Sequence, residues 1–251
     1  ILMTMSNYGG GFSGGVSIRG VPVLNTYGGE VFWVDSGEGS NGNDGTFGKP
    51  WATLDYAVGR CTASRGDIIM VKPGHADTVS AAAGLALDVA GITIVGIGSG
   101  SLQPTVTLDT IITADIDVDA ANITIDNINF VANFADIAVV LDVNATDFTV
   151  RNCRFTQAGA DLNAKVCIQD AAAAASDRIT VENCNAIMYD AANTHFINMA
   201  GTGTGHIVRN NILQGDWGTM AIGGAGVVTF CQITDNVLGN IANTSDGCIS
   251  L

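Results

Sequence analysis

The sequence is poor in basic residues, aromatic side chains and glutamate. Ten Lys and Arg residues stand against 24 Asp and Glu residues, so the formal net charge is −14. A chain this acidic cannot neutralise phosphates as a whole, and we expect neither nucleic acid nor an anionic membrane as a partner. Glu is rare beside Asp, and Gly occurs 32 times. This composition is typical of many tight turns and of few long helices.

Cysteine and long apolar runs are also scarce. Six Cys in 251 residues are too few for a disulfide scaffold, and none has zinc-site spacing, so we expect buried thiols. The most apolar stretch, residues 81–98, is interrupted by Asp88 and several Gly. The beginning of the chain lacks the charged and apolar regions of a signal peptide. We therefore expect a soluble protein that is not exported by the general route.

A repeat of about 27 residues runs through most of the chain. Ile123–Phe130, Phe148–Phe155 and Ile179–Ala186 share an apolar-Thr-apolar-charged-Asn pattern. Each period holds two short β-rich segments separated by loops of variable length. This arrangement is typical of stacked coils in which each strand pairs with its equivalent one coil away. The sequence predicts an all-β fold, a single-stranded right-handed parallel β-helix of about seven coils.

Stacking of the repeats predicts two ladders of side chains. Amide side chains one above another can bond to each other and to the turn backbone. The predicted asparagine ladder comprises Asn127, Asn152, Asn183, Asn210 and Asn236. The residue before each Asn is charged, and the sign of the charge alternates from coil to coil, which favours this register. This predicted charge ladder comprises Asp126, Arg151, Glu182, Arg209 and Asp235.

The chain divides into three predicted segments. Residues 1–30 form a Gly-rich extended arm, ordered mainly by contact with neighbouring chains. Residues 31–66 hold a strand, a loop and a short helix over 50–61 that caps the β-helix. Residues 67–251 form the β-helix itself. Because the sequence stops inside a predicted strand, we expect the chain to continue or another subunit to cover that edge.

Several motifs resemble a known family. Asn43-Asp44-Gly45-Thr46, Lys49-Pro50-Trp51 and Gly66–Gly74 resemble the N-terminal cap of pectin-lyase-like right-handed β-helix proteins. With its Gly-rich leader, the chain is also similar to β-helix proteins of tailed bacteriophages. That resemblance implies a place in the virion after assembly in the host cytoplasm. It also implies capsid or tail proteins as partners and a homo-oligomer, often a trimer.

Stacked carboxylates are the main candidate for a chemical site. Asp88, Asp117 and Asp142 occupy equivalent positions of successive repeats, where they could share a cation such as Ca²⁺ and raise one another's pKa. The paired Asp-Asp, His-Gly and Arg-x-Lys elements of the related hydrolases are absent, as are the Arg-bearing segments of the lyases. We therefore interpret the three residues as an outward ladder, with no catalytic residue, metal or cofactor.

Two further motifs are interpreted as turns. The loop from Asp35 to Thr46 is rich in oxygen ligands but lacks the spacing of an EF-hand. Arg65-Gly66-Asp67 spells a cell-adhesion tripeptide between a predicted helix and a predicted strand. Neither motif changes the functional prediction.

The combined prediction is a non-enzymatic structural protein of a phage particle, a capsid decoration or cement protein. It rests on analogy of fold. The alternative is a tailspike or fibre domain that binds or degrades host polysaccharide. A free polysaccharide lyase would require export.

Overall fold

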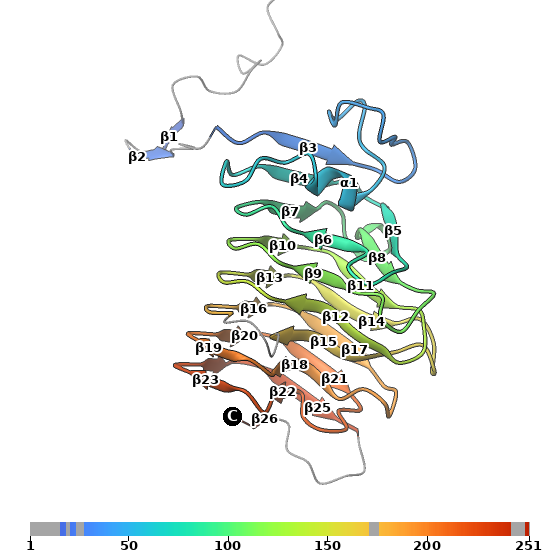
Figure 1. The fold of residues 1–251 in the computed structure, drawn as a ribbon, viewed down its shortest axis with the longest axis vertical. Helices are drawn as coiled ribbons and strands as arrows, with labels where there is room; N and C mark the ends of the chain where they lie inside the picture. The colour runs from blue at the N-terminus through green and yellow to red at the C-terminus, as the bar shows by residue number, and fades with distance from the viewer. Residues whose placement is uncertain (1–15, 19–20, 24–27, 171–175, 242–248, 251) are drawn as a thin grey trace, which may run out of the picture.

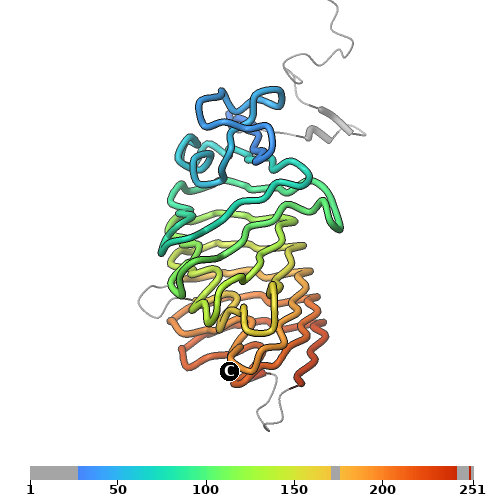
Figure 2. Tube along the Cα trace, turned by 90° about the vertical axis from the view of Figure 1, so that its right-hand side faces the viewer, coloured from blue at the N-terminus to red at the C-terminus, as the bar shows by residue number. Residues whose placement is uncertain are grey.

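Three parallel sheets are stacked along one axis (Figure 1). The computed structural model describes residues 16–18, 21–23, 28–170, 176–241 and 249–250. Each complete coil contributes one strand to each sheet; within these residues sheets 2 and 3 hold seven strands each, and sheet 1 holds an eighth strand at its N-terminal end. The view turned by 90° shows the same stack of coils (Figure 2). The predicted right-handed parallel β-helix is therefore confirmed.

The strands of the three sheets are as follows. Sheet 1 comprises β3 (Val31–Val34), β4 (Ile68–Val71), β7 (Thr93–Gly96), β10 (Thr124–Asp126), β13 (Thr149–Arg151), β16 (Thr180–Glu182), β20 (Ile207–Arg209) and β24 (Gln232–Thr234). Sheet 2 comprises β5 (Ala76–Val79), β8 (Thr105–Leu108), β11 (Asn129–Ala132), β14 (Arg154–Gln157), β17 (Asn185–Met188), β21 (Ile212–Gly215) and β25 (Val237–Asn240). Sheet 3 comprises β6 (Leu85–Leu87), β9 (Ile116–Val118), β12 (Ile137–Val143), β15 (Ala164–Asp170), β18 (His195–Met199), β22 (Ile222–Gly223) and β26 (Ile249–Ser250).

Short elements lie outside these sheets. They are β1 (Val16–Ile18) and β2 (Val21–Val23), which pair antiparallel, β19 (Thr202–Thr204) and β23 (Val227–Thr229), which pair parallel, helix α1 (Leu54–Val58) and a 3-10 turn at Gly100–Leu102. Most of the predicted arm, residues 1–30, lies outside the described residues. Within the described part, no helix has the length and apolar composition needed to cross a membrane.

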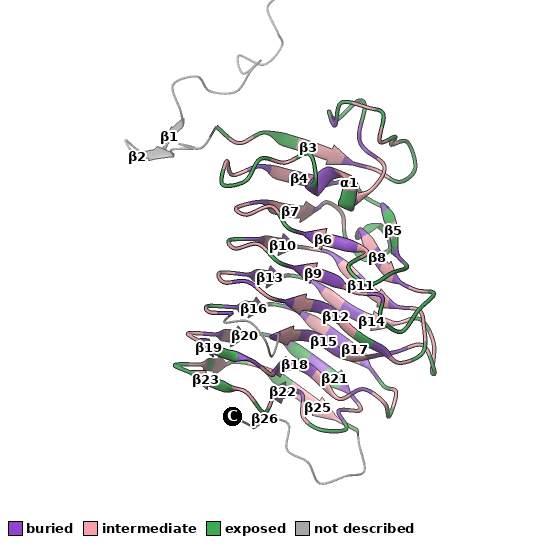
Figure 3. Ribbon diagram, viewed as in Figure 1, coloured by how far each residue is buried: buried purple, intermediate pink, exposed green. Residues whose placement is uncertain are grey.

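The core fills the space between the three sheets. Alternate residues of each strand point inward, as Ile116 and Val118 do on either side of Asp117. Figure 3 shows this alternation of buried and more exposed positions along the stack. Inside, a row of rings crosses the coils. Phe155 lies between Phe130, at 5.1 Å between centroids, and Phe196, at 5.4 Å.

The asparagines between sheets 1 and 2 share a backbone conformation. Asn127, Asn152, Asn183 and Asn210 all have φ between +55° and +59°, a left-handed conformation that Asn tolerates better than most residues. The side chains of the last three are exposed. The Asn127 amide donates to the turn backbone at Gly96 O and Gly98 O, as predicted. In the three exposed copies the shared backbone conformation is the main reason for Asn.

The predicted ladders are out of register by one residue in the last coil. Thr234 pairs with Arg209, so Asp235 takes the left-handed turn position with φ +57°. Asn236 then lies opposite Asn211, one position further on. Asp and Asn both favour turns, so residue type does not distinguish the predicted register from the observed one. The two registers differ by one residue in the length of the segment before β24. Strand pairing therefore decided the register.

Four of the five residues of the predicted charge ladder form ion pairs between neighbouring coils on sheet 1. Arg151 Nε lies 2.9 Å from Asp126 Oδ2, and Arg209 Nη2 lies 2.6 Å from Glu182 Oε2. Asp235 is outside this ladder because of the shifted register. Such exposed pairs contribute only about 0–1 kcal/mol each.

The N-terminal cap differs from the predicted helix over 50–61. Helix α1 begins only at Leu54, after Thr53 accepts a hydrogen bond from Tyr56 N. Trp51 instead extends sheet 1, because its N donates to Trp33 O and its O accepts from Asp35 N, both at 2.9 Å. The tripeptide at 65–67 is structural, since the carboxylate of Asp67 is fully buried and accepts from Arg65 Nε at 2.7 Å.

Replacing Asn183 tests the backbone interpretation of the asparagine turns. Asn183→Leu should lower the free energy of unfolding by about 1–2 kcal/mol, since Leu is strained in the left-handed region. Asn183→Gly should leave it within about 0.5 kcal/mol. Urea unfolding of both variants provides the measurement. An equal loss in the Gly variant would show that the amide group itself stabilises the turn.

Candidate functional site

Two of the three predicted aspartates lie side by side on the outer face of sheet 3. Asp117 of β9 and Asp142 of β12 are register partners, whereas Ala86 and not Asp88 lies opposite Asp117 on the other side. Asp88 follows β6 and is exposed. The predicted alignment of Asp88 was wrong by two residues, a slip that leaves the inward and outward alternation of a strand unchanged.

Further carboxylates surround this pair. Asp115 and Asp119 flank Asp117 along the chain, and both raise its pKa. Burial is the largest cause, and together these effects raise the pKa of Asp117 to about 6. Burial also raises the pKa of Asp142, partly offset by a hydrogen bond from Gln169. Asp117 therefore retains its proton to a higher pH than an ordinary aspartate.

A directed chain of amides leads to Asp142. Asn198 Nδ2 donates to Gln169 Oε1 at 3.3 Å, and Gln169 Nε2 donates to Asp142 Oδ1 at 3.4 Å. These residues occupy the same outward column of sheet 3 on successive coils. Hydrogen bonds to the charged form favour ionisation of a carboxylate. The hydrogen bond from Gln169 therefore offsets part of the rise in the pKa of Asp142 that burial causes, whereas no hydrogen bond offsets the rise at Asp117, one coil away.

The acidic face does not assemble a recognisable metal centre. Among the described residues, no group of three or more His, Cys, Asp and Glu side chains is arranged to hold a metal ion.

The raised pKa of Asp117 predicts a pH-dependent effect on stability. A carboxyl group whose pKa is higher in the folded state stabilises the fold while protonated, and this contribution disappears as the pH rises through about 6. Asp117→Asn should therefore raise the melting temperature at pH 8 and change it little at pH 4. Calorimetry at both pH values checks this, and a variant less stable than the wild type at pH 8 would contradict it.

A second polar cluster lies inside the coil and was not predicted. Asp170 contacts the hydroxyl of Ser176, and Asp170 Oδ2 lies 3.3 Å from His206 Nε2. Ile179 N donates to His206 Nδ1, which places the ring proton on Nε2. All three side chains are fully buried, so a substrate cannot reach them. The signal in the sequence was a polar residue at an inward strand position, since Asp170 pairs with Val143.

The cysteine neighbours Cys153 and Cys184 are free and buried, as expected for core thiols. In the next two coils Asn211 and Asn236 take their place. Asn211 Oδ1 accepts from Cys184 N at 2.8 Å, and Asn236 Oδ1 accepts from Asn211 N at 3.0 Å. A bonded amide ladder thus exists, one position beyond the predicted one.

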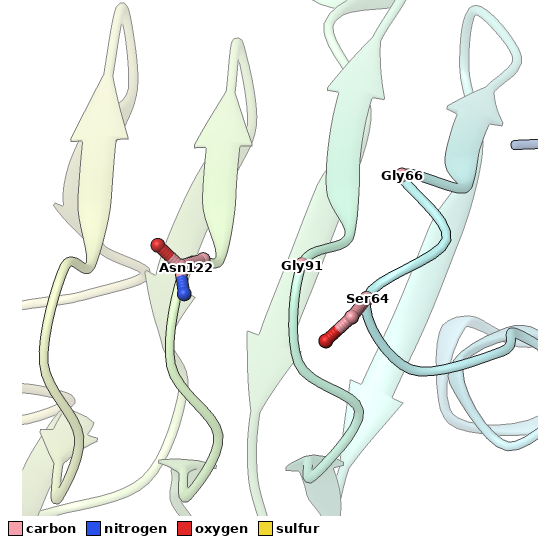
Figure 4. Close-up of a pocket in the computed structure, with 4 residues that line it drawn as sticks. All are labelled: Ser64, Gly66, Gly91 and Asn122. Atoms are coloured by element: carbon pink, nitrogen blue, oxygen red, sulfur yellow. The ribbon is translucent and has the colours of Figure 1, made fainter. Parts of the chain in front are cut away.

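A hollow of about 350 Å³ lies at the turns between sheets 3 and 1. Figure 4 shows its lining residues Ser64, Gly66, Gly91 and Asn122 on neighbouring turns. All four have positive φ, so the hollow follows from the turn geometry. It contains no ionisable side chain and offers no chemistry.

The comparisons with known proteins agree on the fold. No family model matches the chain, and no curated protein matches it. A rhamnogalacturonan lyase structure is similar with a TM-score of 0.52 at 17% identity, over 87% of this chain and 60% of that one. A GH136 lacto-N-biosidase from Eubacterium ramulus is similar with a TM-score of 0.48 at 12% identity, over 84% and 52%. The likeness to the lyase structure shows the fold, a right-handed parallel β-helix.

These findings correct one expectation. The prediction of a non-enzymatic protein is contradicted, because a similar solved structure is a rhamnogalacturonan lyase. The predicted phage origin is not supported by that similarity. The chain spans about three fifths of the lyase's length.

Proposed function

We propose that the protein is a carbohydrate-active β-helix that hydrolyses glycosidic bonds with Asp117 and Asp142. The observation that carries this proposal is the register pairing of the two carboxylates on an open outer face. Glycoside hydrolysis requires one protonated and one ionised carboxyl group on either side of the bond to be cleaved. Burial raises the pKa of both residues, and of the two only Asp142 accepts a hydrogen bond that favours its ionised form.

Each carboxyl group has a defined role. Asp117, with a pKa raised to about 6, protonates the leaving oxygen as the general acid. Asp142, whose carboxylate accepts a hydrogen bond from Gln169, attacks the sugar as the nucleophile and forms an ester with it as the leaving oxygen departs. Asp117 then removes a proton from the water molecule that cleaves this ester and frees Asp142. Register partners on adjacent strands are about 4.8 Å apart, near the separation of about 5–5.5 Å found in retaining enzymes. We expect retention of the anomeric configuration.

Elimination of an acidic sugar fits this site less well. That reaction needs a basic side chain to neutralise the uronate and to remove a proton. Within the described residues, no Lys, Arg or His forms an ion pair with Asp115, Asp117, Asp119 or Asp142. The causes that shift the pKa of Asp117 are burial and other carboxylates only.

The test is a cleavage assay on a panel of glycans. The purified protein is incubated with uncharged oligosaccharides of hexoses and N-acetylhexosamines and with oligogalacturonates, and new reducing ends are measured at pH 5–6. Release of reducing ends that Asp142→Asn abolishes supports the proposal. The absence of cleavage across the panel, or cleavage that Asp142→Asn leaves intact, overturns it.

The other functional predictions stand apart from this proposal. Action on host polysaccharide was the alternative prediction from sequence, and the fold comparison favours it over capsid decoration. The virion location, the capsid or tail partners and the homo-oligomer stay predictions.

A further inference from the structure

A polar column runs along the helix axis beyond the carboxylate pair. The outward residue at this position of sheet 3 is Asp117, Asp142, Gln169 and Asn198 on four successive coils. All four side chains are partly accessible. Three steps of about 4.8 Å give a column of about 14 Å, enough for several sugar units laid end to end.

The column ends at a cavity. A hollow of about 280 Å³ is lined by His195, Asn198, Thr219, Met220, Gly224 and Ala225. Asn198 therefore belongs both to the amide chain and to the cavity. The cavity combines polar groups with the apolar surface of Met220, the combination that typical small-molecule sites use for orientation and contact area.

One polar atom at this cavity has no partner. His195 Nδ1 is buried and makes no hydrogen bond within the described part of the chain. An unpaired buried polar atom costs about 1–3 kcal/mol, so a turn of the imidazole that brings Nδ1 to a ligand hydroxyl in the cavity gives this atom a partner. Burial lowers the pKa of His195, which keeps the imidazole neutral and able to bond to an uncharged group.

We infer that the substrate is a linear uncharged glycan that lies along the helix axis, from the Asp117 and Asp142 pair across Gln169 and Asn198 into the cavity beside His195. This inference rests on the proposed function and adds the direction, length and charge class of the ligand. The amides and the neutral imidazole bond to hydroxyl groups, and Met220 contacts the apolar face of a sugar ring.

The charge class follows from the electrostatics of the face. Asp115 and Asp119 lie beside the catalytic pair, and Asp142 continues the negative charge along the column. A polyuronate would bring further carboxylates into this field, where like charges disfavour one another. An uncharged chain has no such cost, which separates this site from one for acidic polysaccharide.

The experiment measures binding separately from cleavage. Asp142→Asn, which cannot cleave under the proposed function, is titrated by calorimetry with the same panel of uncharged oligosaccharides of two to six units and with hexagalacturonate. We expect affinity to rise with length up to the units that fill the column, and no binding of hexagalacturonate. Adding Asn198→Ala should weaken binding of the longest bound oligosaccharide about tenfold, because one or two hydrogen bonds are lost. The affinity for the disaccharide should stay unchanged.

Asn185→Ala is the matched control. Asn185 is an equally half-buried outward Asn on sheet 2, and its replacement should leave glycan affinity unchanged. Failure of every uncharged oligosaccharide to bind, preferred binding of hexagalacturonate, or equal effects of the two Asn variants would each overturn the inference. Cleavage by the wild type without any dependence on chain length or on Asn198 would overturn the axial path alone. Length-dependent binding without cleavage would leave the path standing and overturn the hydrolytic proposal.

Discussion

Asp117→Asn is expected to lower the rate of glycan cleavage by about two to four orders of magnitude, the usual contribution of a positioned general acid. Asparagine keeps the size of the side chain but has no proton of suitable acidity to donate. In the wild type, the rate should fall as the pH rises above about 6, where Asp117 loses its proton. Initial rates of the wild type and the variant across pH 4–8 provide the measurement.

Asp235→Asn is the control for this substitution. Asp235 is exposed and occupies a left-handed turn position that Asn fills in the preceding coils, so its replacement should change neither the rate nor the fold. The same substitution at Asp117 should raise stability at pH 8 while it removes activity. A rate that survives Asp117→Asn, or one lost equally in Asp235→Asn, would show that Asp117 is not the acid.

Phe155→Ala should lower the free energy of unfolding by about 3–5 kcal/mol, the range for deletion of a buried ring. Phe155 is 1% exposed and lies between Phe130 and Phe196 in the row of rings that joins three coils. The stack on either side cannot close the cavity without moving whole strands. Denaturant unfolding followed by circular dichroism measures the loss.

Phe230→Ala provides the comparison. Phe230 is 90% exposed and has φ +55°. Phe and Ala are equally strained at this φ, and the substitution removes little buried surface. The free energy of unfolding of the Phe230→Ala variant should stay within about 0.5 kcal/mol of the wild-type value. Equal losses in the two variants would mean that the aromatic row does not support the coils.

The repeat made the architecture predictable from the sequence. Apolar residues at alternate positions, returning about every 27 residues, require that equivalent strands stack. The pairing of Asp126 with Arg151 and of Asp117 with Asp142 follows from that spacing wherever the turns are equally long. These local features need no knowledge of distant contacts.

The exact register and the state of each carboxyl group depend on tertiary structure. The sequence alignment placed Asp88 wrongly by two residues and Asn236 wrongly by one. Both registers are decided only by which backbone groups bond across coils. The cavity beside His195 is formed by β18 and the segment around β22, more than twenty residues apart. The sequence by itself determined a stacked β-helix with acidic side chains on its surface. Only the folded chain decided which carboxylate is buried enough to keep a proton, because a pKa depends on desolvation and on neighbours brought together in space.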